Sequence, residues 1–301
     1  MNTTVKNKLK ETLEFIEGAY APATIRAYKG NFDAFIRFCD MHHENALPAS
    51  PENISNYIKK LTGRKLKSSS IRIAIASLSA IHRLNRMDDP TQDPIVKIEM
   101  RRMHRNLGRE SKQAFGINKE MLMEMLNTLD SSLKGLRDSA IILLAYEGMC
   151  RRSEIVSIKI EDIEIKHIDN GLVDLKIKLR KSKTDQEGIG KWLHIQNESK
   201  KAIIKWIEAS EVKSGYLFRA INKSGVLSER LCASQINRIF KRVAINTKIS
   251  EEIVKSISGH SMRVGAAQDL ILLGASLPVI MTKGRWSKSE TVIRYIERTQ
   301  I

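Results

Sequence analysis

The sequence has few cysteines and no long hydrophobic run. Its 301 residues contain three cysteines, odd in number and far apart, at Cys39, Cys150 and Cys232. This spacing favours neither a disulfide framework nor a zinc site, so we predict a reducing, cytoplasmic environment and no bound metal. The longest apolar run, 140–146, is much shorter than a membrane span, and the N-terminal residues lack the pattern of a signal peptide. We therefore expect no membrane segment.

Acidic residues are outnumbered by basic ones. The chain has 51 lysines and arginines against 34 aspartates and glutamates, a formal net charge of +17. Such an excess favours a polyanionic partner, nucleic acid before an anionic membrane. No glycine-rich loop ends in Lys-Ser or Lys-Thr, so the sequence does not indicate ATP use. Charge alone does not distinguish a DNA-binding protein from a DNA-processing enzyme.

Residues 1–103 show the apolar spacing of helices and no convincing strand. Apolar stripes predict helices over 5–16, 22–39, 51–60, 68–81 and 94–103. We therefore predict that 1–103 forms an α-helical domain with short connections, and that it binds DNA.

Basic residues gather on the predicted exposed faces of this domain and just after it. The apolar stripe fades over 101–115, so we predict a basic interdomain linker over 104–115 and a second domain over 116–301. A single basic residue on a helix is usually only solvated, and an ordinary domain joint can be basic too. The collective bias nevertheless favours contact with DNA phosphates. The candidates are Arg26, Lys29, Arg72, Arg101, Arg102 and Arg105.

The second domain is predicted to combine helices with a small sheet. Apolar spacing predicts helices over 119–129, 136–148, 198–209, 233–243, 264–273 and 277–281. Apolar and charged residues alternate over 173–179, which predicts a half-buried strand, and a turn over 181–188 leads to a returning strand over 191–195. Ser234, Gln235 and Arg238 lie on the outward face of one helix. Such a face can read a DNA major groove, although it is more often merely soluble.

Two pairs of polar residues, each spaced three apart, lie near predicted helix starts. Arg151 and Glu154 form either a structural ion pair or an anion clamp in which Glu154 orients Arg151. His260 and Arg263 are predicted to share one face of a first helical turn. A helix N-terminus attracts anions, so this face would suit a phosphate, although such pairs are usually surface pairs.

Three further positions have both an ordinary and a functional interpretation. A lysine in the turn 181–188, Lys181 or Lys183, is normally a solvated charge, but at a hairpin tip it could donate a proton to a reacting group. Trp286 is either a core side chain or an indole N–H donor to an oxyanion. Tyr295 has the spacing of an aromatic that flanks the core.

Together these residues resemble the site of the tyrosine site-specific recombinases of the phage integrase family. The matching positions are Arg151 with Ser153 and Glu154, Lys183, the box His260-Ser261-Met262-Arg263, Trp286 and Tyr295. The resemblance extends over both predicted domains. It implies a C-shaped clamp on DNA, made of an α-helical, SAM-like core-binding domain and a mainly α catalytic domain with a small antiparallel β-sheet.

The resemblance also implies a mechanism without metal, ATP or any other cofactor. Tyr295 would attack the scissile phosphate and form a 3′-phosphotyrosine, while Lys183 would protonate the leaving 5′ oxygen. The resemblance does not decide strongly between Lys183 and Lys181.

Five residues would surround the reacting phosphate in that mechanism. Arg151 and Arg263 would stabilise its developing charge, and His260 and Trp286 would add hydrogen bonds. Glu154 would orient Arg151.

The implied partner is a double-stranded DNA target site with inverted repeats. A homodimer would bind one site, and a homotetramer would form the synaptic complex and exchange strands through a Holliday junction. The resemblance places the protein at the nucleoid, encoded by a prokaryote, a phage or a plasmid. Only the residues 296–301 follow Tyr295, so we expect weak, DNA-dependent tetramer assembly.

Two alternatives remain open at this stage. One is a non-catalytic, sequence-specific DNA-binding regulator with the same fold. The other is an enzyme similar to type IB topoisomerases, which cleaves and reseals DNA without strand exchange.

Overall fold

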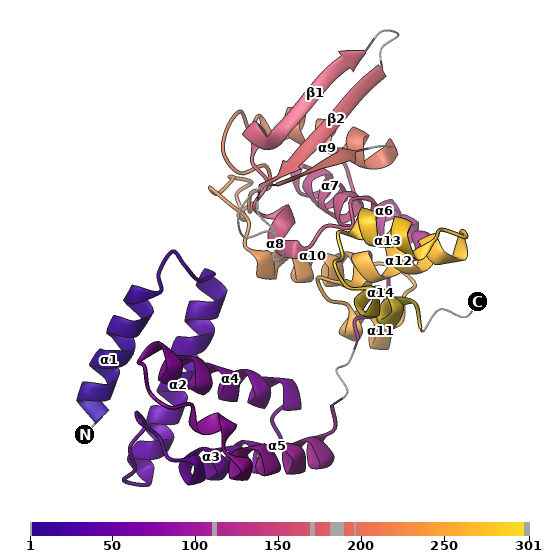
Figure 1. The fold of residues 1–301 in the computed structure, drawn as a ribbon. Coiled ribbons are helices and arrows are strands. Elements are labelled where there is room, and N and C mark those ends of the chain that lie inside the picture. The colour runs from indigo at the N-terminus through magenta and orange to yellow at the C-terminus, as the bar shows by residue number, and fades with distance from the viewer. Residues whose placement is uncertain (1, 110–112, 169–171, 181–189, 196, 298–301) are drawn as a thin grey trace. The chain divides into compact units, whose positions relative to one another are not determined.

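The computed structural model describes residues 2–109, 113–168, 172–180, 190–195 and 197–297. The chain divides into two compact units, Met1–Lys112 and Gln113–Ile301 (Figure 1). Each unit has a hydrophobic core of its own.

The described part of the first unit is entirely helical, as predicted. Its helices are α1 (Asn2–Phe15), α2 (Pro22–Met41), α3 (Pro51–Gly63), α4 (Ser68–Leu84) and α5 (Pro94–Leu107). The side chains of Ser50 and Asp93 cap α3 and α5, each just before a proline at the first helical position. Helix α2 packs along α4, and α3 packs along α5. Phe32, Phe35 and Ile36 of α2 are fully buried between these helices.

Helix α5 continues beyond its predicted end. We predicted a linker from residue 104, but the helix includes 104–107 and ends before Gly108, whose φ is +73°. Met103 is buried and Leu107, four residues later, packs on the same core, so the apolar stripe continues between charged neighbours. Arg101, Arg102 and Arg105 are therefore exposed residues of a helix.

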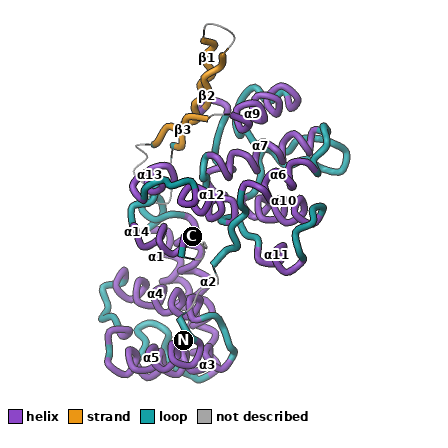
Figure 2. The backbone as a smooth tube through the Cα atoms, turned by 90° about the vertical axis from the view of Figure 1, so that its right-hand side faces the viewer, coloured by secondary structure: helices purple, strands orange, loops and turns teal. Residues whose placement is uncertain are grey.

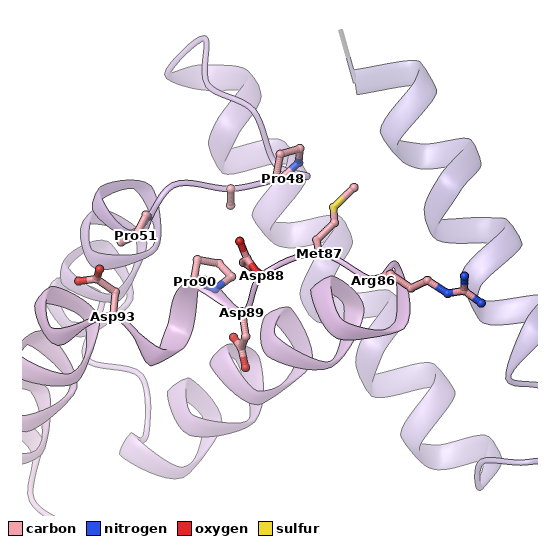
Figure 3. A pocket seen from close by; sticks show the side chains of 9 residues that line it. Pro48, Pro51, Arg86, Met87, Asp88, Asp89, Pro90 and Asp93 are labelled. Carbon is pink, nitrogen blue, oxygen red and sulfur yellow. The ribbon is translucent and has the colours of Figure 1, made fainter.

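A surface pocket in this unit is lined by loop residues between α2 and α5 (Figure 3). Asp89, one of its carboxylates, accepts hydrogen bonds from the hydroxyls of Ser79 (2.6 Å) and Thr91 (2.7 Å). Asp93 caps α5 by accepting a hydrogen bond from the Ile95 N–H (2.8 Å). These two carboxylates therefore stabilise the loop and the helix start.

His82 of α4 is a fully buried histidine whose two ring nitrogens are both hydrogen-bonded. Its Nε2 accepts a hydrogen bond from the Ala49 N–H (3.0 Å), and its Nδ1 donates to the Leu78 carbonyl (2.8 Å). Because a backbone N–H can only donate, these bonds require the neutral ring. Burial lowers the pKa of His82 below its usual value.

The stability of the first unit is therefore expected to fall as the pH decreases from the unfolded-state pKa of about 6.5 towards the lower pKa of the folded unit. In that range the unfolded chain binds a proton at His82 and the folded unit does not. The free energy of unfolding then decreases by up to about 1.4 kcal/mol per pH unit. Hydrogen exchange of the Ala49 segment, corrected for intrinsic rates, measures this change.

Two histidine variants serve as the comparison. His82→Gln should reduce the pH dependence, whereas His43→Gln, at an exposed histidine, should leave it unchanged. A smaller part should remain in both, because burial and Arg109 also lower the pKa of His104. Equal pH dependence in both variants would show that His82 is not responsible.

The second unit consists mostly of helices, and the C-terminal half of one of them, α7, is buried. The helices are α6 (Lys119–Asn127), α7 (Leu133–Glu147), α8 (Arg152–Ile155), α9 (Asn197–Ser210), α10 (Ala233–Ile245), α11 (Glu251–Ser256), α12 (Ser261–Leu272), α13 (Leu277–Gly284) and α14 (Ser289–Ile296). The apolar run 140–146 forms the buried C-terminal half of α7, which packs against α9 and α12. In the described parts of both units, no helix has the length and apolar character of a membrane span.

A three-stranded antiparallel sheet completes the second unit (Figure 2). Strands β2 (Leu172–Leu179) and β3 (Lys191–Ile195) confirm the predicted strands and pair with each other. The other edge of β2 pairs with β1 (Ile163–Ile168), which was not predicted. Leu175, Ile177 and Ile195 are buried on one face of the sheet. The pairing of Leu179 with Lys191 places 180–190 in the connection between β2 and β3.

Candidate active site

The corner between α7 and α8 holds Arg151 and Glu154 together. Arg151 is the N-cap of α8, and Glu154 lies three residues later. The Glu154 carboxylate accepts hydrogen bonds from the Arg151 backbone N–H (2.9 Å) and from Arg151 Nη1 (2.6 Å). The Glu154 side chain is 1% exposed and that of Arg151 is 14% exposed. The buried carboxylate thus fixes a guanidinium that is still partly accessible to a ligand.

Arg285, which the sequence did not single out, shares the same carboxylate. It follows α13 in the left-handed conformation, with φ at +56°. Its Nη2 donates to Glu154 Oε2 (2.9 Å) and to the Met149 carbonyl (3.0 Å), and its Nη1 donates to the Gly148 carbonyl (3.0 Å). In the sequence it is only the middle residue of a Gly-Arg-Trp turn, and no apolar periodicity there indicates that it is buried.

Helix α12 begins in close contact with the segment before α6. A Cβ added at Gly265 would lie 1.8 Å from the Ile117 carbonyl oxygen, so only glycine fits there. The Ile117 N–H also donates to the Ser261 carbonyl (3.0 Å). These contacts place the first turn of α12 against the core of the second unit.

Arg263, on that first turn, is 1% exposed. Its guanidinium donates hydrogen bonds to the carbonyls of Met149 and Gly284. The guanidinium carbon lies 4.1 Å from the centroid of the Trp286 ring. Arg263 therefore contacts both the α7–α8 corner and the turn after α13.

His260 and Arg263, predicted to share one face of a first helical turn, differ in their exposure to solvent. His260 is the N-cap of α12, outside its first regular turn, and it is exposed. Arg263, three residues later, is buried where α12 packs against α7.

The site has more positive than negative charge. Arg151 and Arg285 both pair with the Glu154 carboxylate, and Arg263 lies near enough to interact with it electrostatically. Burial, with the positive charges of Arg151 and Arg285, lowers the pKa of Arg263 to about 9. Burial by itself would raise the pKa of Glu154, but the charge of Arg285 and the hydrogen bonds from Arg151 outweigh it and lower that pKa. The carboxylate is therefore ionised, and the remaining positive charge favours an anion such as phosphate.

Trp286 and Tyr295 lie beside this arginine cluster. Trp286 is 9% exposed, and its ring centroid is 5.7 Å from that of Tyr295 on α14. The Tyr295 carbonyl accepts a hydrogen bond from Gln268 Nε2 on α12 (3.1 Å), which ties α14 to α12. Tyr295 is partly buried, packed against the core as its spacing predicted, and it lies next to the predicted site residues.

Lys183 and Lys181 lie outside the described residues. Both belong to the connection between the paired strands β2 and β3. Within the described ranges, no group of His, Cys, Asp and Glu side chains could hold a metal ion.

The candidate DNA contacts are mostly exposed. On the first unit, the exposed residues are Arg26, Lys29, Arg72, Arg101, Arg102 and Arg105. Arg102 is paired with Glu99 (3.1 Å). On α10, Ser234 and Arg238 are exposed, whereas Gln235 accepts a hydrogen bond from the Cys232 N–H (2.8 Å) and so helps to cap the helix. A glutamine three residues after an N-cap is a sequence signal for a capping role.

Two family models match the chain. The phage integrase family model matches residues 117–300, and the model of the phage integrase N-terminal SAM-like domain matches residues 9–86. The second match confirms the predicted SAM-like helical domain.

Curated relatives and solved structures agree with these matches. A recombinase named cre from Escherichia phage P1 is 28% identical over 86% of this chain and 79% of that protein. A XerD homolog from Selenomonas ruminantium, described as an integrase/recombinase, is 28% identical over 100% of this chain and 89% of that protein. XerH recombinase bound to a palindromic difH substrate has a TM-score of 0.63 at 17% identity, over 92% of this chain and 76% of that one. A lambda integrase dimer bound to a core site has a TM-score of 0.62 at 14% identity, over 97% and 76%.

Proposed function

Because the chain belongs to the phage integrase family, we propose that it is a tyrosine recombinase that cleaves and rejoins double-stranded DNA, with Tyr295 as the nucleophile. The observation that carries this proposal is the position of Trp286. Its ring lies against the Arg263 guanidinium (4.1 Å) and near the Tyr295 ring (5.7 Å). An anion-binding cluster of arginines and a tyrosine therefore belong to one site, as in-line attack on a phosphodiester requires.

The proposed reaction exchanges one phosphodiester bond for another. The Tyr295 oxygen attacks the scissile phosphorus, and the bond to the 5′ oxygen breaks as the 3′-phosphotyrosine forms. Arg151 and Arg263 stabilise the charge that develops on the phosphate oxygens, a role that metal ions have in other phosphoryl-transfer enzymes. Glu154 holds Arg151 in position through its two hydrogen bonds. The reaction therefore requires no cofactor.

Three other side chains complete the proposed mechanism. Lys183 is the general acid that protonates the leaving 5′ oxygen. His260, exposed at the N-cap of α12, and the indole N–H of Trp286 donate hydrogen bonds to the phosphate. A second step, with a 5′-hydroxyl as the nucleophile, reverses the reaction and rejoins the strand.

The proposed substrate is an inverted-repeat DNA site in the cytoplasm, at the nucleoid. The basic faces of the first unit and α10 of the second unit supply phosphate and base contacts. A homodimer binds one site, and a homotetramer joins two sites and exchanges strands through a Holliday junction. Solved relatives bound to substrate or core-site DNA support this choice of partner.

Recombination between two target sites tests the proposal. The site is selected from a random DNA pool with Tyr295→Phe protein and then placed twice on one plasmid. Wild type should yield recombinant plasmids, and Tyr295→Phe should yield none. Relaxed plasmid without recombinants would support a topoisomerase-like enzyme instead, and specific binding without either product would support a non-catalytic regulator.

A further inference from the structure

Arg285 has three features that disfavour an arginine at its position. Its backbone is left-handed (φ +56°, ψ +47°), a conformation that favours glycine. Its side chain is 6% exposed, and burial of a charged side chain is costly. Its Nε is buried and has no hydrogen-bond partner among the residues that the structure describes. A residue selected only for stability would avoid these costs, and strain of this kind is typical of functional sites.

The acceptors that bind Arg285 also bind the two proposed catalytic arginines. Glu154 Oε2 accepts hydrogen bonds from Arg285 Nη2 and from the Arg151 N–H, both at 2.9 Å. Glu154 Oε1 accepts from Arg151 Nη1 (2.6 Å). The Met149 carbonyl accepts from Arg285 Nη2 (3.0 Å) and from Arg263 Nη1. Arg285 thus connects the acceptor that holds Arg151 with an acceptor that holds Arg263.

The Met149 carbonyl is itself part of an unusual corner. Met149 is fully buried and has φ at +45°, a backbone conformation that residues other than glycine rarely adopt. The fork of Arg285 binds this carbonyl and the preceding one, at Gly148, each at 3.0 Å. These two bonds hold the corner in the conformation from which Arg151 starts α8.

We propose that Arg285 is a positioning residue for DNA cleavage, which holds Arg151 and Arg263 in fixed orientations through Glu154 and the Met149 carbonyl. The inference rests on the proposed function. Hydrogen-bond donors stabilise a transition state best when they are oriented before the reaction begins. Because the Arg285 side chain is buried, it contributes to cleavage without contributing to the DNA interface.

The main test variant is Arg285→Gly, which removes the side chain and suits the left-handed backbone. Its single-turnover cleavage rate at saturating protein should be about 10- to 100-fold below wild type, as when other groups that orient functional ligands are removed. Its affinity for the target site, measured in a Tyr295→Phe background, should stay within about twofold of the parent. Arg285→Lys can still pair with Glu154 and should recover part of the rate.

A double variant separates positioning from a general structural role. In a Glu154→Gln background, Arg285→Gly should lower the cleavage rate less than about threefold. The carboxylate through which Arg285 acts on Arg151 is already absent there. Arg86→Gly is the matched control: Arg86 has the same φ of +56° but is exposed, so its loss should leave the cleavage rate unchanged. Thermal unfolding establishes that each variant is folded at the assay temperature.

Three results would overturn the inference. If Arg285→Gly is folded and cleaves at the wild-type rate, a positioning role is excluded. If only Arg285→Lys is folded, the same result in that variant excludes it. An equal loss of rate in the wild-type and Glu154→Gln backgrounds would exclude action through Glu154. If wild type itself forms no covalent complex with DNA, the proposed function fails and the inference fails with it, which differs from either variant result.

Discussion

Replacing Arg263 by lysine is expected to lower the single-turnover rate of DNA cleavage about 100- to 1,000-fold, the usual loss when one positioned donor to a developing oxyanion is removed. Lysine keeps the charge but cannot form both hydrogen bonds, to the carbonyls of Met149 and Gly284, while packing flat on the Trp286 ring. An ammonium is also more strongly hydrated than a guanidinium, so its burial costs more. The substitution should therefore misplace the proposed donor to the phosphate.

The measurement uses a nicked target-site duplex under protein excess, with DNA affinity determined separately in a Tyr295→Phe background. Arg230→Lys is the control because Arg230 is an exposed arginine of the same unit, and its rate should stay within about twofold of wild type. A rate for folded Arg263→Lys within tenfold of wild type would contradict the proposed role of the guanidinium fork.

Replacing Asp138 by alanine is expected to destabilise the second unit by about 3–5 kcal/mol, the typical cost of removing one partner from a buried ion pair. Asp138 on α7 is fully buried. Its Oδ1 accepts hydrogen bonds from Arg137 Nε (2.9 Å) and Nη2 (2.7 Å), and its Oδ2 accepts one from Arg242 of α10. Without the carboxylate, the buried Arg137 guanidinium loses its only close negative partner in the described structure.

Urea unfolding followed by tryptophan fluorescence measures this effect in the second unit, because Trp192, Trp206 and Trp286 all belong to it. Asp174→Ala is the control: its ion pair with Lys176 (3.4 Å) is partly exposed and should contribute less than about 1 kcal/mol. A loss below about 1 kcal/mol for Asp138→Ala would mean that the network does not stabilise the fold. Because Arg242 lies on the helix that carries Ser234 and Arg238, the variant should also weaken sequence-specific binding.

Most of the helices and two of the three strands could be predicted because their apolar residues are periodic, whereas the short helix α11 was not predicted. Strand β2 alternates buried Leu175, Ile177 and Leu179 with charged residues, and that pattern has no helical interpretation. Strand β1 was missed because apolar and charged residues alternate only over 163–166, a stretch too short to indicate a strand by itself. Its Ile165 remains 42% exposed at the sheet edge. The end of α5 was misplaced because charged residues separate Met103 from Leu107.

The candidate site was predicted from residue types and spacing together with the resemblance to the tyrosine recombinases, whereas the part played by Arg285 depends on tertiary structure. Arg151 and Glu154 are close in sequence, so their ion pair follows from helix geometry. Arg285 is 131 residues from Glu154, and nothing local indicates that a turn residue is buried against that carboxylate. The burial of Arg263 likewise depends on Gly265, whose contact with Ile117 is set by the fold.

The measurement that tests the central claim most directly is covalent capture of the protein on DNA. The protein is mixed with the nicked target-site duplex in EDTA, and SDS-stable complexes are compared between wild type and Tyr295→Phe. Wild type should form a metal-independent complex whose 3′-phosphate is attached to Tyr295, and Tyr295→Phe should form none. Tight, specific binding by wild type without any covalent complex, or an equal complex in Tyr295→Phe, would contradict the account.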